Sequence, residues 1–125
     1  MIHLDTHVLL WVCAGDIGRL PARAARRVQQ SRPIVSPMVG LELQYLHEIG
    51  RVARPAYELL DRMRQRVGLV VSERPFPVVA ARAWTLDWTR DPFDRLIAAA
   101  ALVDDLPLIT ADQTLLANCA VAEWD

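Results

Sequence analysis

"RDPFDRLIAAAALVDDLPLITAD", residues 90–112, contains two apolar runs of different length, and the second ends on a carboxylate. The first run, within 91–106, has the length of a helix. Asp91 is a strong N-cap for that helix, because the proline after it suits the first helical position. The shorter run, 106–112, has the length of a strand and ends on Asp112. The stretch therefore predicts a helix that leads directly into a strand.

Short apolar strands and helices alternate in this way along the whole chain. Parallel strands need long crossover connections, usually helices, so the alternation predicts a mostly parallel sheet of four or five strands. We expect a three-layer α/β/α fold in a single domain, 1–125, because the chain has the length of one core. Strands are expected at 1–5, 33–37, 69–72, 106–112 and 120–124, and helices at 6–15, 21–31, 38–50, 54–68, 76–89, 91–106 and 113–119.

The composition is that of a well-packed globular protein, with 53% hydrophobic and 23% charged residues and a net charge of -1. The chain contains no lysine, so any contacts of side chains with phosphate must come from its arginines. Cys13 and Cys119 have no metal-type spacing and are expected to be buried thiols. No segment is long and apolar enough to span a membrane, and the amino-terminal segment has no basic region; we therefore expect a cytoplasmic protein.

Carboxylates fall at or near the carboxyl ends of the predicted strands. Asp5 ends the first strand, and Asp112 ends the fourth. Asp91 and Asp94 begin the helix before that fourth strand, and Glu42 lies in the helix that follows the second. Ligands of open parallel sheets bind outside the carboxyl ends of the strands, where the strand order reverses. The five carboxylates are therefore expected at one edge of the sheet.

Most of these acids also have a structural explanation. Asp5 and Asp112 can cap the helices that they precede, and Asp94 stands where a carboxylate favours the helix dipole or completes a capping box. Asp104 and Asp105, at the far end of the same helix, are expected to be solvated turn residues. Other α/β proteins with acids at strand ends, receiver domains and haloacid-dehalogenase-like phosphatases, rely on a lysine that this chain lacks.

Carboxylates crowded at one edge repel one another, which raises some of their pKa values unless a cation neutralises them. No cysteine or histidine cluster accompanies them, so an oxygen-only site for a hard ion such as Mg²⁺ or Mn²⁺ is predicted. Such an ion suits phosphodiester hydrolysis, because it polarises the phosphoryl oxygen and activates water.

The sequence resembles PIN-domain ribonucleases, and within them the VapC-like toxins of toxin–antitoxin pairs. The resemblance covers essentially the whole chain and rests on four segments in the family's order: "LDTHVLLW" at 4–11, "SPMVGLELQYL" at 36–46, "RDPFDRLIAAAAL" at 90–102 and "LPLITAD" at 106–112. It implies an Mg²⁺-dependent endoribonuclease, with Mn²⁺ as the alternative ion. A catalytically inactive PIN-like module that binds RNA or protein is the alternative function.

The family's acids carry over to this sequence residue by residue. The resemblance implies that four carboxylates are catalytic and position the attacking water on RNA: Asp5, Glu42, Asp94 and Asp112. It implies that Asp5, Asp94 and Asp112 bind the metal. Glu42 and Asp91 are the further candidates for metal binding, directly or through water.

Other polar residues beside these acids are candidates for supporting roles. Thr6 and Thr110 match hydroxyl positions of the family, where a hydroxyl can orient a carboxylate or water. An ordinary role as helix-start or strand residue stays open for each. Arg95 can reach phosphate, although pairing with a site carboxylate is the preferred interpretation. His3 is expected to be a hydrogen-bonded strand residue, and His7 a residue outside the cleft.

The resemblance also implies the partners: an RNA substrate, a cognate VapB-like antitoxin whose tail fills the cleft, and a second copy of the chain in a homodimer. The helix at 6–14 is apolar nearly all round, and either this face or the tryptophans can supply a groove or a dimer face. The tryptophans are Trp11, Trp84, Trp88 and Trp124; core packing is expected for Trp11 and Trp84.

Overall fold

The computed structural model describes all residues, Met1–Asp125, and is built around a five-stranded sheet in the order β3-β2-β1-β4-β5. All four strand pairings are parallel. The order reverses at β1, which pairs with β2 on one side and with β4 on the other. The strands are β1 (Ile2–Leu4), β2 (Pro33–Val35), β3 (Val70–Val71), β4 (Leu108–Ile109) and β5 (Ala122–Glu123). The predicted mostly parallel sheet is confirmed.

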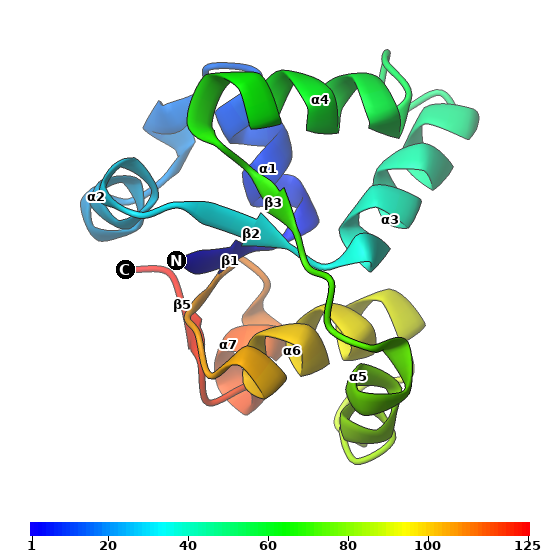
Figure 1. Cartoon of the computed structure of the whole chain (residues 1–125). Helices are drawn as coiled ribbons and strands as arrows, with labels where there is room; N and C mark the ends of the chain where they lie inside the picture. The colour runs from blue at the N-terminus through cyan, green and yellow to red at the C-terminus, as the bar shows by residue number, and fades with distance from the viewer.

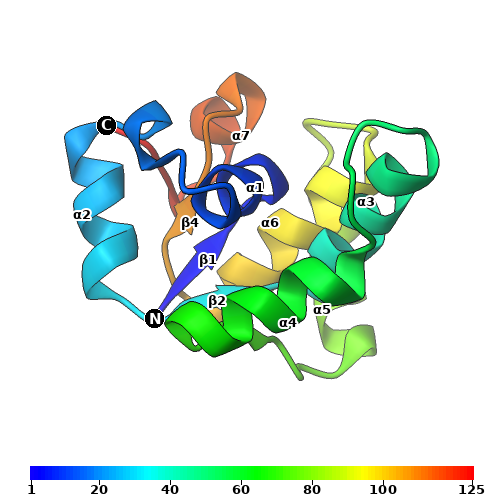
Figure 2. The ribbon, with the colours of Figure 1, turned by 90° about the horizontal axis from the view of Figure 1, so that it is seen from above.

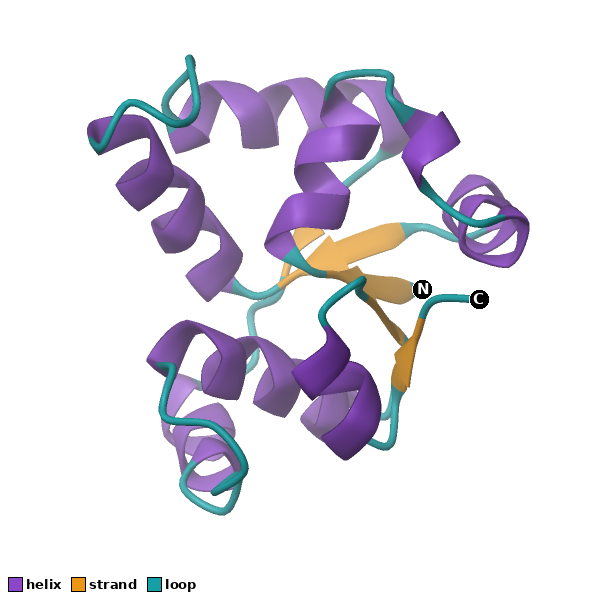
Figure 3. Ribbon diagram, turned by 180° about the vertical axis from the view of Figure 1, so that it is seen from behind, coloured by secondary structure: helices purple, strands orange, loops and turns teal.

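Helices cover both faces of this sheet (Figure 1). They are α1 (Thr6–Cys13), α2 (Ala22–Gln30), α3 (Pro37–Glu48), α4 (Ala56–Val67), α5 (Phe76–Ala83), α6 (Pro92–Asp104) and α7 (Gln113–Asn118), with a 3-10 turn η1 (Ile17–Arg19). Helices α1, α3 and α4 lie on one side of the sheet and α5, α6 and α7 on the other, as the view from behind also shows (Figure 3). Helix α2 lies at the opposite end of the sheet from α3 (Figure 2). The expected three-layer arrangement is confirmed, and no helix has both the length and the hydropathy of a membrane span.

The core lies between these layers. Every residue of β1, β2 and β4 is buried, as expected for central strands with a helical layer on each face. The run Ala98–Ala101 of α6 is also fully buried, and its small side chains let α6 pack closely against α5 and α3. Both cysteines are buried free thiols, as predicted.

The structure differs from the expected elements mainly after α5. The helix expected at 76–89 ends at Ala83, where the Thr85 hydroxyl donates a hydrogen bond of 2.7 Å to the Arg82 carbonyl and competes with further helical bonds. Trp84 follows directly and is 77% exposed, so the expectation that it packs in the core was wrong. Trp11, in contrast, is half-buried and packs against the core.

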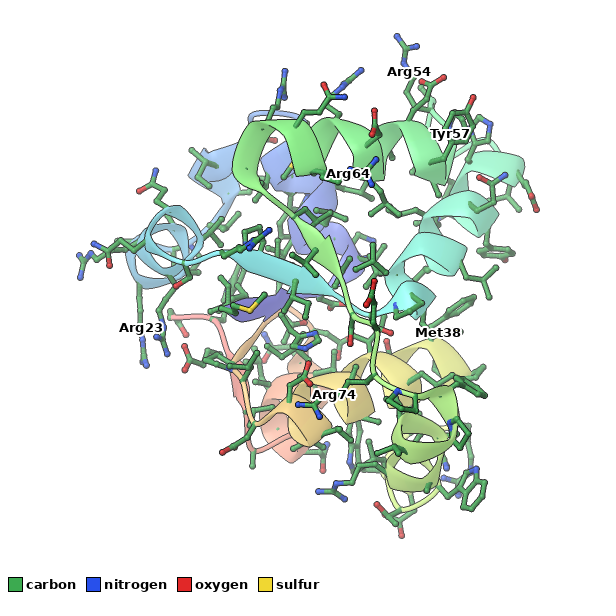
Figure 4. All side chains as sticks on the ribbon, in the orientation of Figure 1. Arg23, Met38, Arg54, Tyr57, Arg64 and Arg74 are labelled. Atoms are coloured by element: carbon green, nitrogen blue, oxygen red, sulfur yellow. The ribbon has the colours of Figure 1, made fainter.

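The expectation of a solvated Asp104 was also wrong. Its side chain is only 7% exposed and accepts a hydrogen bond of 2.6 Å from Nε2 of the buried His3 of β1. Nε of Arg74, labelled beside α6 in Figure 4, donates to the other carboxylate oxygen. Burial lowers the pKa of His3, and its Nδ1 has no hydrogen-bond partner. Asp105 is exposed, as predicted, and ends α6 in the left-handed conformation with φ of 52°.

Asp104→Asn should lower the free energy of unfolding by about 1.5 kcal/mol, because hydrogen bonds to a charged partner contribute about that much or more. The matched control is Asp105→Asn, since asparagine tolerates the left-handed conformation and the site is exposed. Urea unfolding should show a lower midpoint for Asp104→Asn alone. Equal midpoints for the two variants would mean that the bonds to His3 and Arg74 contribute nothing measurable.

Candidate active site

Five carboxylates line one cavity of about 380 Å³ at the carboxyl ends of β1 and β4. They come from four parts of the chain: the starts of α1, α6 and α7, and the second turn of α3. The strand order reverses at this place, and the sequence predicts that a ligand binds here. The cavity is lined by Asp5, His7, Trp11, Glu42, Asp91, Asp94, Ala111 and Asp112.

Asp5 is held rigidly between the two central strands and α1. It is the N-cap of α1, and its Oδ1 accepts a hydrogen bond of 2.8 Å from the Thr6 N–H. Its Oδ2 accepts a bond of 2.6 Å from the hydroxyl of Thr110, the residue that follows β4. Burial raises the pKa of Asp5, and the two hydrogen bonds partly oppose that rise by stabilising the anion. Asp5 thus has one defined orientation toward the cavity.

Thr110 also connects Asp5 to Asp112. The Thr110 hydroxyl accepts a hydrogen bond of 3.0 Å from the Asp112 N–H while its own proton points to Asp5. Asp112 caps α7, since its Oδ1 accepts a bond of 2.9 Å from the Leu115 N–H. The fully buried Thr110 therefore fixes both the carboxylate of Asp5 and the backbone at Asp112.

Glu42 reaches the cavity from α3, a helix whose start is fixed by the Ser36 cap, with Pro37 at the first helical position. The hydroxyl of Thr6 donates a hydrogen bond to Glu42 Oε1. Thr6 is fully buried and lies at the start of α1, so this bond ties α3 to α1 beside the cavity. Burial of the half-buried Glu42 carboxylate raises its pKa, and the nearby Asp5 adds to the rise.

The two acids of α6 differ in what holds them. Asp91 is the helix cap that the sequence predicts, and its Oδ1 accepts bonds of 2.9 Å from the Phe93 N–H and 3.4 Å from the Asp94 N–H. No protein group donates a hydrogen bond to the Asp94 carboxylate. Burial and then repulsion by Asp91, Asp112, Asp5 and Glu42 raise the pKa of Asp94 to about 7.

The donor set fits a hard divalent cation in chemistry and charge. All five acids offer carboxylate oxygens, and the repulsion at Asp94 is what a bound cation would remove. In this structure, no three of these side chains lie close enough together to coordinate one metal ion. The hydroxyls of Thr6 and Thr110 hold Glu42 and Asp5, and no protein hydrogen bond holds the Asp94 carboxylate, whose pKa is raised by burial and by repulsion from the other four acids. Oxygen ligands suited to such a cation are therefore present in one cavity.

The remaining candidates lie differently from what the sequence suggests. Arg95 does not line this cavity and does not pair with a site carboxylate, so the preferred interpretation was wrong. Its Nε donates a hydrogen bond of 2.7 Å to the Thr89 carbonyl, and its side chain lines a separate groove between α5 and α6. His7 lines the cavity, contrary to expectation, and so does Trp11, which also packs against the core as expected. The spacing of these two residues, four positions apart on α1, places both on one helix face and was the available signal.

Comparisons with known proteins agree with this architecture. The family model described as PIN domain matches residues 2–120. Among solved structures, a "Toxin-antitoxin complex from Klebsiella pneumoniae" has a chain with a TM-score of 0.66 and 17% identity, covering 98% of this chain and 96% of that one. A chain of "VapBC2 from Rickettsia felis bound to a DNA fragment from their promoter" has a TM-score of 0.64 and 20% identity, with 100% of both chains covered. The search of curated proteins finds no match.

Proposed function

This chain belongs to the PIN domain family, and on that premise we propose that it is a metal-dependent endoribonuclease that hydrolyses RNA phosphodiester bonds. One observation carries the proposal. Five carboxylates from four parts of the chain line a single cavity at the point where the strand order reverses, and burial together with repulsion by the other four raises the pKa of Asp94 to about 7. A site that served only to pack the core would gain nothing from this repulsion.

We assign the binding of Mg²⁺, or of Mn²⁺ in its place, to Asp5, Asp94 and Asp112, with Glu42 and Asp91 contributing directly or through water. When bound, the ion supplies charge neutralisation at the phosphate and a more acidic water. The protein's own part is orientation: Thr110 fixes Asp5 and the backbone of Asp112, and Asp91 fixes the start of the helix that carries Asp94. Glu42, whose pKa is raised by burial, can hold a proton taken from the attacking water.

We further propose that the protein is the toxin of a toxin–antitoxin pair and acts on RNA in the cytoplasm. The two solved structures described above are of toxin–antitoxin proteins, and their chains match this one over nearly the whole length. The proposed partners are accordingly a VapB-like antitoxin, which inhibits the enzyme, and a second copy of this chain in a homodimer.

The test is cleavage of total RNA by the purified protein, freed of any co-purifying partner. With Mg²⁺ or Mn²⁺ the protein should produce discrete RNA fragments, and EDTA should abolish their formation because the carboxylates then have no cation to hold. Addition of the metal after EDTA should restore cleavage. A folded, partner-free protein that cuts no RNA with either metal would support the inactive binding module instead.

A further inference from the structure

Aromatic rings continue from the acidic cavity along α1. His7 and Trp11 both line the cavity, and their ring centroids lie 6.3 Å apart. Trp11 is half-buried, with Trp124 at 6.0 Å on one side and the guanidinium of Arg19 at 5.5 Å from its ring centroid. The indole is therefore braced by its neighbours while it keeps a surface in the cavity, next to Asp5 and Asp112.

A second pair of rings belongs to α3 and α6, the helices that carry Glu42 and Asp94. Tyr45 lies one helical turn beyond Glu42 and is 50% exposed, and Phe93 directly precedes Asp94. Their ring centroids are 6.3 Å apart and the planes are tilted by 33°. The carboxylates thus have an aromatic pair along α1 and another along α3 and α6.

We propose that Trp11 is a stacking platform for a nucleobase of single-stranded RNA next to the cleaved phosphate, with the Tyr45–Phe93 pair as a second platform. This inference rests on the proposed nuclease function and assigns a base-binding role to Trp11. Stacking on aromatic side chains accepts any base, because every base has a π-face. Bases within a duplex are already stacked on their neighbours, so the duplex gains nothing from these rings.

The charges around the cavity favour this mode of binding. The chain has no lysine, and the cavity lining contains five carboxylates and no arginine, so before a cation binds the protein repels a phosphate chain at the cavity. Stacking needs no positive protein charge, and so provides attraction where the electrostatic field is unfavourable. The Arg19 guanidinium lies over the Trp11 ring, and it can contact a phosphate of the same strand while the indole surface in the cavity holds the base.

The experiment compares Trp11→Leu, Trp11→Phe and Trp84→Leu on a short single-stranded RNA that the wild-type protein cleaves at one position. Trp84 is the matched control, because it is exposed and lines the groove between α5 and α6 instead of the acidic cavity. Trp11→Leu should lower kcat/KM by about 10-fold, mainly through KM, whereas Trp11→Phe should retain most of it. Tyr45→Leu should act in the same direction, and Trp84→Leu should cleave like the wild type.

A substrate with one base removed tests the contact directly. In the wild type, removing the base that stacks on Trp11 should lower kcat/KM by a similar factor, and in Trp11→Leu the same removal should have little further effect. Equal losses at every base position, or a Trp11→Leu variant that cleaves normally, would overturn the proposal. Normal cleavage together with weaker inhibition by the antitoxin would assign Trp11 to the protein partner, and would likewise overturn it.

A binding measurement separates this inference from the nuclease proposal. If the wild-type protein cleaves no RNA, the nuclease proposal fails, and fluorescence anisotropy of a labelled single-stranded RNA with Mg²⁺ still tests the stacking. About 10-fold weaker binding by the folded Trp11→Leu variant would then support the platform, and unchanged binding would refute it. Thermal unfolding of each variant tests whether its fold is retained. If Trp11→Leu does not fold, Trp11→Phe, which keeps an aromatic ring, should still bind nearly as the wild type does.

Discussion

Asp94→Asn should lower the rate of RNA cleavage by about 100-fold or more, because loss of even an outer-shell partner of a metal ligand costs about 10- to 100-fold. Asp94 is the cavity acid that no protein group hydrogen-bonds, so its charge is available for a cation. The change removes that charge and keeps the side chain's shape. Cleavage of a defined RNA at fixed Mg²⁺ measures the loss, and Mg²⁺ titration tests whether higher metal concentrations recover part of it.

The matched control is Asp105→Asn, the same chemical change at the other end of α6. Asp105 is exposed, lies outside the cavity, and has a backbone conformation that asparagine tolerates, so cleavage should stay at the wild-type rate. The metal-free Asp94→Asn protein should be at least as stable as the wild type, because a repelled carboxylate has been removed. Wild-type cleavage by folded Asp94→Asn would contradict the proposed metal site.

The fold was largely predictable because its signals are local. The stretch 90–112 contains a capped helix and a strand in direct succession, and α6 and β4 form there. Element ends were less predictable. The hydrophobic pattern of 76–89 continues beyond α5, but the Thr85 hydroxyl bond to the Arg82 carbonyl and the exposure of Trp84 depend on side-chain and tertiary context.

The sequence predicts which acids form the candidate site, but it does not predict the hydrogen bonds that hold them. The rule for parallel sheets and the family resemblance both place Asp5, Glu42, Asp94 and Asp112 together, and the structure brings them to one cavity. The bond from Thr6 to Glu42 joins residues 36 positions apart, and no local pattern specifies that pairing.

Asp104 shows the same limit for a structural residue. Its position at the end of an apolar helix is typical of a solvated turn residue. Its partner His3 lies 101 positions away, so only the packing of β1 against α6 reveals a buried carboxylate there. Sequence spacing predicts which face or edge a residue occupies, but side-chain partners across the sheet require the folded chain.

The pKa of Asp94 predicts how stability should depend on pH in metal-free protein. Its folded value of about 7 lies above its ordinary value of 3.8, so the folded state binds the proton more tightly. The resulting stabilisation is fully present below about pH 3.8 and is lost as the pH rises through 7. His3 has the opposite sign, since its lowered pKa removes stability as the pH falls below 6.5. The difference between wild type and Asp94→Asn isolates the contribution of Asp94.

Addition of Mg²⁺ should therefore raise the melting temperature, and by more at pH 8 than at pH 5. At pH 8 the Asp94 carboxylate is ionised and free for the cation, whereas at pH 5 the cation must displace a proton. At 100 times its Kd, a ligand stabilises the folded state by about 2.7 kcal/mol, which corresponds to a shift on the order of 10 °C for a domain of this size. Asp94→Asn should show a smaller shift with a weaker dependence on pH, because only the other proposed ligands still titrate. An Mg²⁺ shift that is equal at both pH values, or equal in the variant, would mean that Asp94 does not bind the cation, whatever the effect of its replacement on cleavage.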